Sequence, residues 1–257
     1  MNQLRFVGSG PASLLGVGGM RQEQDGIVGS MTLGAGSLGR DGRTAVGSLG
    51  VLVDESLGYA IMGSLPQGTW SISTEIWIDV IAPLPSRGAE LIARAAALVS
   101  GSFSRGQVHD SSGRLLVECR QRGRLAPTPP ELLESTPADR HDRAPGADRL
   151  DAALGLRTEG DVHVLETRRD LANPRWMLHG GISLAASEVV AVQSREERGC
   201  SLPTSSVHIV HTRGVPLAAQ VEFRSQTRHA GRTLWVTDVI GTVDGKVCTV
   251  ATVTAQE

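Results

Sequence analysis

Two stretches of the chain are apolar on every side of a helix and carry a carboxylate at matching positions. They read RTAVGSLGVLVDESLGYAIM and NPRWMLHGGISLAASEVVAV, and they predict buried helices over residues 47–62 and 180–193. The matching acids are Asp54 and Glu188. A carboxylate buried without a partner is costly, so a repeated one points to chemistry more than to packing.

The same pattern of apolar and polar positions occurs twice along the chain. With Asp54 placed on Glu188, an offset of 134, the alternating segment STEIWIDVIAPLP falls close to SVHIVHTRGVPLA, which pairs Ser73 with Ser206 at an offset of 133. Each half reads as a strand, a loop, a helix and three strands. We therefore predict an α+β protein of two tandem units, each an antiparallel sheet wrapped around a central helix.

A proline-rich polar segment separates the two halves. It reads RGRLAPTPPELLESTPADRHDRAPGADR and has too little apolar content to form a core. We predict an N-terminal unit over residues 1–122, a linker over 123–149 and a C-terminal unit over 150–257.

The overall composition narrows the function classes. The 257 residues carry a net charge of -2, which gives no general attraction for nucleic acid or an anionic membrane. Three cysteines form neither a disulfide framework nor a metal-ligand spacing. The N-terminal residues lack the pattern of a signal peptide, and no apolar run is long enough to span a membrane. We expect a cytoplasmic protein with no metal and no bound cofactor.

Several weaker signals are set aside. GAGSLG, residues 34–39, matches a dinucleotide-binding string but lacks the strand-turn-helix context, so a connector is the better interpretation. His208 and His211 are three apart in one predicted strand, on opposite faces, which is poor for shared metal ligation. A solvated face is the favoured interpretation of Arg224, Arg228 and Arg232, although CoA phosphates could also bind there. Packing is favoured over a pocket wall for Trp70, Trp77 and Trp176.

A four-part spacing in the second half resembles a known family. Asn173 is followed after six residues by His179-Gly180-Gly181, then by Glu188 nine residues after the histidine and by Ser206 eighteen after the acid. This resembles the hotdog-fold thioesterases, in the branch of the phenylacetic-acid-pathway (PaaI-like) enzymes. The first half resembles them less well. It retains Gly47, Asp54 and Ser73, with Gly39 in the place of the asparagine and Ala45-Val46 in the place of His-Gly.

The resemblance implies a fused double hotdog with its active site between the units. The intact site would combine Asn173, His179, Gly180 and Gly181 with Asp54 and Ser73. A Gly180 or Gly181 N–H would bind the oxyanion, Asp54 would be the base or nucleophile, and Asn173 would position water. Ser73 would bond near the acid or the substrate, and His179 could instead orient the helix start.

The reciprocal site would pair Glu188 and Ser206 with Gly47. It lacks the asparagine and the histidine, so it would be inactive or remodelled for binding, and one productive site per chain is expected.

The function implied is hydrolysis of acyl-CoA or related acyl thioesters, with CoA entering only as part of the substrate. Two alternatives stay open. One is a non-catalytic acyl-thioester binding or regulatory module on the same fold. The other, less favoured, is a hotdog hydratase or dehydratase, whose Asp-x-Asn-Pro-x-His segment is not present around Asn173-Pro174. The acyl group is not readable from the sequence, and a homo-oligomer is compatible with it but not required.

Overall fold

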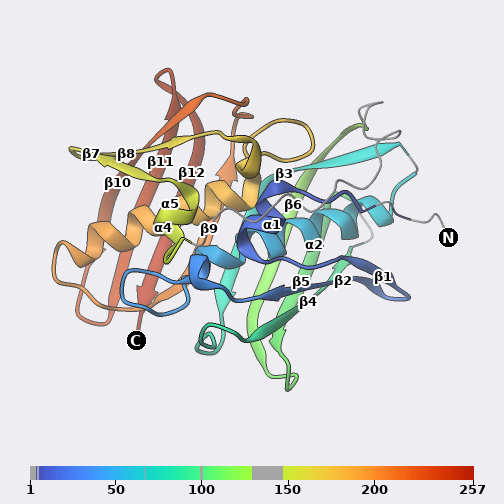
Figure 1. Cartoon of the computed structure of the whole chain (residues 1–257), viewed down its shortest axis with the longest axis horizontal. Coiled ribbons are helices and arrows are strands. Elements are labelled where there is room, and N and C mark those ends of the chain that lie inside the picture. Colours follow the sequence, from blue (N-terminus) through green and yellow to red (C-terminus); the bar gives the residue numbers. More distant parts are fainter. Residues whose placement is uncertain (1–3, 5, 67, 99–100, 129–146) are drawn as a thin grey trace.

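The computed structural model describes residues 4, 6–66, 68–98, 101–128 and 147–257 (Figure 1). In this part of the chain, one antiparallel sheet of twelve strands runs through both halves. The first half contributes β1 (Arg21–Glu23), β2 (Gly26–Thr32), β3 (Thr69–Val80), β4 (Glu90–Ala97), β5 (Phe103–Asp110) and β6 (Leu115–Pro127). The second contributes β7 (Arg157–Glu159), β8 (Val162–Glu166), β9 (Thr204–His211), β10 (Gln220–Ala230), β11 (Leu234–Val243) and β12 (Lys246–Gln256).

The strand order is symmetric about the middle of the sheet. It runs β1-β2-β4-β5-β6-β3-β9-β12-β11-β10-β8-β7, so each strand of one half has a counterpart in the other. The two halves meet where β3 pairs with β9, with Trp77 opposite His208 and Asp79 opposite Ser206. We call this strand pair the seam.

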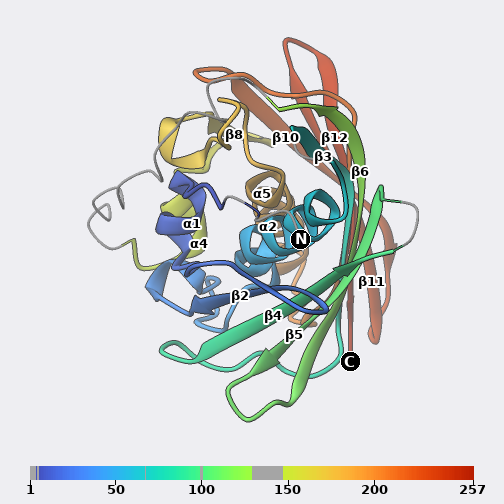
Figure 2. The ribbon, with the colours of Figure 1, turned by 90° about the vertical axis from the view of Figure 1, so that its right-hand side faces the viewer.

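The helices lie inside the curve of the sheet, with α2 and α5 along its concave face (Figure 2). They are α1 (Gly10–Leu15), α2 (Gly50–Gly63), α4 (Leu150–Leu154) and α5 (Gly180–Glu196), with short 3-10 turns at Ala35–Ser37, Val46–Leu49 and Arg169–Leu171. Since α1 and α4 cover the side away from the sheet, α2 and α5 are enclosed. This enclosure explains why both helices are apolar on every side.

The two central helices touch through glycines at their N-terminal ends. A Cβ atom on Gly181 would lie 2.3 Å from the Gly50 carbonyl oxygen, and one on Gly47 would lie 2.8 Å from the Cα atom of Ala185. Only glycine permits so close an approach of backbone to backbone. The crossing brings the start of α5 beside the second turn of α2.

Equivalent backbone bonds recur in both halves at the predicted offset of 134 residues. Gly39 N–H donates to Arg43 O and Ala45 N–H to Ser37 O, as Asn173 N–H donates to Met177 O and His179 N–H to Leu171 O. The loop before each helix is therefore the same structure built from different side chains.

Two details differ from the sequence-based expectation. Each half has two strands before its helix and four after it, not one and three. Strand β6 continues to Pro127, so residues 123–127 belong to the sheet and not to the linker. Residues 129–146 of the predicted linker lie outside the described residues. Within the described residues, none of the helices has the length and apolar character needed to cross a membrane.

The offset of 134 also fails in the strands after the helices. A bulge leaves Thr74 unpaired in β3 and Ser205 unpaired in β9. Matching these bulges sets Ser73 against Thr204, and not against Ser206. Because an error of two residues preserves the alternation of a strand, the sequence pattern could not reveal it.

Candidate active site

The predicted acid of the first half contacts the predicted glycine of the second. Asp54, on the second turn of α2, is only 8% exposed. Its Oδ2 accepts a hydrogen bond from the Gly181 N–H at 2.9 Å. The first N–H groups of a helix have no partner within the helix and carry positive partial charge, so the end of α5 stabilises this carboxylate.

His179 is the N-cap residue of α5, with its Nδ1 3.1 Å from the Gly181 nitrogen, and lies beside the same acid. Its Nδ1 atom is 3.2 Å from Asp54 Oδ2, and its Nε2 atom is 3.7 Å from Glu55 Oε1. Burial alone would lower the pKa of His179, but the two carboxylates outweigh burial and raise it. The raised pKa favours an imidazolium that donates from Nδ1 to Asp54, which leaves the Gly181 N–H bonded to Asp54 alone.

Gly180 forms the surface between this acid and the neighbouring strand. A Cβ atom here would lie 2.7 Å from both Asp54 Oδ2 and Ser73 Oγ. Among the described residues, no acceptor receives a hydrogen bond from the Gly180 N–H. The site therefore presents a free donor at a helix N-terminus, directly beside a carboxylate and a hydroxyl.

His211 belongs to the site although sequence reasoning considered it only as a metal ligand. The alternation of β9 buries Val207 and Ile209 and turns His211 inward with them. Its Nε2 lies 3.3 Å from the Gly180 carbonyl oxygen. Burial lowers the pKa of His211, against the opposing effect of Asp54, so the ring is neutral and donates from Nε2. Its buried Nδ1 is then an acceptor with no partner among the described residues.

Two amide side chains complete the surroundings. With its amide oriented to satisfy its neighbours, Gln121 donates to Asp54 Oδ1 at 3.2 Å. The Oδ1 of Asn173 accepts from the backbone N–H groups of Arg175 and Met177, at 2.9 and 3.2 Å. The acceptor end of Asn173 therefore holds its own loop, and only its amide N–H groups are left for a ligand.

These residues line a cavity of about 490 Å³, which we call the Asp54 cavity. Asp54, Ser73, Asn173, His179, Gly180 and His211 all line it. Trp70 is in its wall, but Trp77 stacks on His208 on the outer face of the sheet and Trp176 is exposed. Three arginines also line it: Arg124, Arg175 and Arg213.

The reciprocal position holds a different set of side chains. Glu188 of α5 is 2% exposed, and a Cβ atom on Gly47 would lie 3.2 Å from its Cβ. Its Oε1 accepts from Thr204 Oγ1 at 2.8 Å, which in turn accepts from Arg195 Nη2 at 2.9 Å. The prediction that Ser206 lies beside this acid is wrong, because Ser206 is in the seam opposite Asp79 and Thr204 takes the place.

Glu188 lines a second cavity, of about 780 Å³, which we call the Glu188 cavity. It lies on the other side of the helix crossing and shares no lining residue with the Asp54 cavity. Ala45 and Val46 line it where His179 and Gly180 line the first. A histidine cap and a free glycine N–H are thus both missing from this side.

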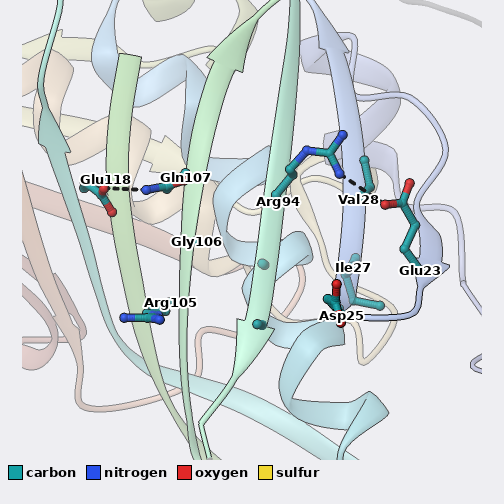
Figure 3. Close-up of a pocket in the computed structure, with 12 residues that line it drawn as sticks. Glu23, Asp25, Ile27, Val28, Arg94, Arg105, Gly106, Gln107 and Glu118 are labelled. Carbon is teal, nitrogen blue, oxygen red and sulfur yellow. Dashed lines mark hydrogen bonds and ion pairs between the residues drawn. The ribbon is translucent and has the colours of Figure 1, made fainter. Parts of the chain in front are cut away.

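A third hollow, on strands of the first half, has the character of an ordinary surface (Figure 3). Two pairs of its polar side chains bond to each other. Arg94 pairs with Glu23 at 3.1 Å, and Gln107 donates to Glu118 at 2.7 Å. The hollow contains no buried acid beside a helix end, so we do not assign a function to it.

Two other candidate features from the sequence, metal ligands and the arginines of the later strands, do not contribute to either cavity. No cluster of three metal-ligating side chains occurs within the residues that the structure describes. Arg228 pairs with Asp238, and Arg224 with Glu222 and Asp161, on exposed strands away from both cavities.

The comparisons with known proteins establish the fold. No protein-family model matches the chain. No curated protein is detectably similar to it in sequence. Solved structures do match over most of their length. The 12:0-ACP thioesterase from Umbellularia californica has a TM-score of 0.61 at 14% identity, over 90% of this chain and 94% of its own.

Two bacterial structures give the same result. A protein named as a thioesterase from Novosphingobium aromaticivorans has a TM-score of 0.60 at 15% identity, over 92% of this chain and 97% of its own. An acyl-ACP thioesterase from Bacteroides thetaiotaomicron has a TM-score of 0.50 at 9% identity, over 94% and 98%. The resemblance to the PaaI-like branch in particular stays a prediction. The chain has the hotdog fold of these structures, in the form of two hotdog units joined in one sheet.

Proposed function

We propose that the chain hydrolyses acyl thioesters in the Asp54 cavity. One observation carries the proposal: a buried carboxylate from one half lies beside a free N–H at the helix start of the other half, in the wall of a cavity. Thioester hydrolysis needs both groups, because water must be activated on one side of the carbonyl and negative charge stabilised on its oxygen.

The Gly180 N–H would bind the oxyanion. A thioester carbonyl oxygen would accept from it as the tetrahedral intermediate forms, with the positive end of α5 behind it. A single donor of this kind is worth on the order of 3 kcal/mol in the transition state. The absence of a side chain at Gly180 leaves room for that oxygen beside Asp54 and Ser73.

Asp54 would take the proton of a water molecule or attack the carbonyl itself. In the first route the water oxygen bonds to the carbonyl carbon, its proton moves to Asp54, and the carbon–sulfur bond breaks. The thiolate then leaves with that proton. The Gly181 N–H and the His179 ring hold the Asp54 carboxylate in place. The Nε2–H of His211 would hold the Gly180 carbonyl, and with it the start of α5, in place.

The thiol part of the substrate would meet the arginines of the cavity wall. Arg124, Arg175 and Arg213 are suited to the phosphates of CoA or of a phosphopantetheine arm. We propose acyl-CoA as the substrate. The choice between these thiols is tested with one acyl group, presented first on CoA and then on an acyl carrier protein. The ratio of the two kcat/KM values shows which thiol is preferred.

The test of the hydrolase is release of free thiol from a panel of acyl-CoAs, from acetyl to palmitoyl and including phenylacetyl. The wild type should release thiol from at least one of them. Asp54→Asn should lower kcat/KM at least about 100-fold, the usual effect of losing a general base. Glu188→Gln is the matched control, because it changes the corresponding acid of the other half, and it should retain most of the activity.

The reverse ranking of these two variants would show that the Glu188 cavity is the catalytic one. A panel that binds without releasing any thiol would instead favour the non-catalytic binding module.

A further inference from the structure

The Glu188 cavity has the size and walls of a small-molecule site. Its volume of about 780 Å³ exceeds that of the Asp54 cavity and lies within the range of known ligand pockets. Its walls come from both halves, with the loops around residues 38–46 and 80–86 facing α5. Much of the lining is apolar: Leu38, Val46, Val80, Leu84, Val189, Val192 and Leu202.

This cavity is not an extension of the proposed substrate site. The two cavities share no lining residue, and the helix crossing lies between them. At that crossing, a Cβ atom added to Gly50 would lie 2.4 Å from the Gly181 carbonyl oxygen. The helices are therefore too close for the acyl chain of a ligand to pass between them. A ligand of the Glu188 cavity would therefore be bound in addition to a substrate in the Asp54 cavity.

Two buried polar side chains in this cavity have donors to spare. Gln193 is 4% exposed, and its amide makes no hydrogen bond to any described residue. Arg195 is 5% exposed and donates from Nε to Leu202 O at 3.1 Å and from Nη2 to Thr204 Oγ1. Its Nη1 group donates to nothing in the described part of the chain. The free donor atoms are not enclosed by protein and open on the cavity, where a ligand can accept from them.

No ion pair joins Arg195 to a carboxylate in the described part of the chain, although Asp41, Glu196 and Glu257 also line the cavity. Burial raises the pKa of Glu188, against the opposing effects of Arg195 and Thr204, which favours a neutral carboxyl group. Asp151 also lines the cavity, but it pairs with Arg40 and Arg149 at 3.3 and 3.2 Å. A desolvated guanidinium with a free edge is suited to a carboxylate.

The free donors of Gln193 and Arg195 have no counterparts in the Asp54 cavity. At the offset of 134, Gln193 corresponds to Tyr59 and Arg195 to Ile61, and neither counterpart carries a free donor. The hydroxyl of Tyr59 is bonded to Val7. Gln193 and Arg195 are therefore not remnants of a second copy of the proposed catalytic site.

We propose that the Glu188 cavity binds a monocarboxylic acid with an apolar tail, whose carboxylate accepts from Arg195 and Gln193 while the tail packs on the apolar walls. Acids of this class are what hydrolysis of an acyl thioester releases, so the ligand would be chemically a product. The binding itself does not depend on the hydrolytic activity.

Decanoate is the probe, titrated calorimetrically into the full chain, with decanol and decylamine as head-group controls. The expected result is binding of decanoate at least about tenfold tighter than of decanol, with no detectable binding of decylamine. The same result should be obtained with Asp54→Asn, which separates this proposal from the hydrolase. Equal affinity for decanoate and decanol would overturn it.

Two matched variants locate the binding. Val192 and Gly58 occupy corresponding positions in the two cavities, and a Cβ atom on Gly58 meets Gln121 only at an ordinary 3.5 Å. Val192→Phe fills the Glu188 cavity and should weaken decanoate binding at least tenfold, whereas Gly58→Val narrows the Asp54 cavity and should leave this binding intact. The opposite pattern would place the acid in the Asp54 cavity and refute the proposal.

The head group is tested with Arg195→Gln, which should remove the preference for decanoate over decanol. Arg195 also holds Leu202 and Thr204, so circular dichroism must first show that this variant folds. Gln193→Leu provides the second measurement, because the Gln193 amide holds no other part of the protein. Unchanged preference in the folded variants would contradict the proposal.

Discussion

Asp54 Oδ2 accepts a hydrogen bond from the Gly181 N–H at 2.9 Å, although 127 residues separate the two in the sequence. The bond joins the acid of one repeat to the helix start of the other. Neither repeat contains both groups at one place, so the site exists only because the two sheets are continuous across the β3–β9 seam. The reciprocal acid, Glu188, packs on Gly47 but accepts its hydrogen bond from Thr204.

A methyl group on Gly180 should stop the reaction without unfolding the protein. The new Cβ would lie 2.7 Å from Asp54 Oδ2 and Ser73 Oγ, which are side-chain atoms that can move aside. Their displacement fills the place of the oxyanion, so we expect Gly180→Ala to lower kcat about 100-fold or more. Gly58→Ala, in the same cavity with an ordinary contact, is the control and should stay near wild type. Equal activity of both variants would remove Gly180 from the mechanism.

A methyl group on Gly181 should act on stability instead. Its Cβ would lie 2.3 Å from the Gly50 carbonyl oxygen and 2.6 Å from Val51 N, which are backbone atoms at the helix crossing. The helices must move apart, and overpacking of this kind costs about 1–3 kcal/mol or more. Urea unfolding of Gly181→Ala measures the loss. Gly19→Ala, with nothing near the added atom, should show almost none.

His211 should be needed for the hydrogen bond that it donates to the Gly180 carbonyl. His211→Gln retains an N–H donor for this carbonyl, and His211→Phe loses it. We expect kcat to fall in that order, wild type above the Gln variant and the Gln variant above Phe. Because burial lowers the pKa of His211, wild-type kcat/KM should hold below pH 6.5 until this ring is protonated. Asp54 and His179 face the same ring, so the low-pH limb must also be compared with that of the Gln variant.

The sequence predicted the repeat, both acids and the glycines because these features depend on local periodicity. A helix that is apolar on every side must be enclosed by the rest of the protein. An acidic residue within such a helix is therefore easily recognised in the sequence. The same reasoning failed for Ser206, since Thr204 follows Glu188 by only sixteen residues whereas Ser73 follows Asp54 by nineteen. Thr204 could have been found only with the register known.

Other members of the site were missed because they come from separate elements. The sequence analysis considered His211 only as a metal ligand together with His208. The alternation of β9 already indicated that His211 lies on the face of the strand toward the helices. Gln121 reaches Asp54 from β6, and Arg195 reaches Thr204 from two turns beyond Glu188. Contacts of this kind follow from the strand order, which one sequence does not disclose.

The protonation of His179 should appear in the pH dependence of stability. Its pKa is raised in the folded protein by Asp54 and Glu55, which together outweigh burial. The stability that it contributes is fully present below the pKa of the unfolded chain, about 6.5, and is lost as the pH rises through the folded pKa. The Tm of the wild type should therefore decline relative to that of His179→Gln between pH 6 and pH 9. A gap that widens with pH would mean that the buried ring is neutral.

Glu188 should penalise folding near neutral pH. Burial raises its pKa above the ordinary value, so the unfolded chain ionises first as the pH rises from about 4.5. The folded protein holds the extra proton over this window. The wild type then loses up to about 1.4 kcal/mol of unfolding free energy per pH unit, until the pH reaches the folded pKa.

Replacing this acid by its amide removes the penalty. Glu188→Gln keeps an oxygen to accept from Thr204 but does not titrate, so its advantage over the wild type should grow between pH 4.5 and pH 7 in urea unfolding. Asp161→Asn, at a side chain that is 91% exposed, is the control and should show no such growth. A flat difference for Glu188→Gln would mean that Arg195 keeps the carboxylate charged. The free positive charge assigned to the Glu188 cavity would then be absent, and the carboxylic-acid ligand proposed for it would lose its main attraction.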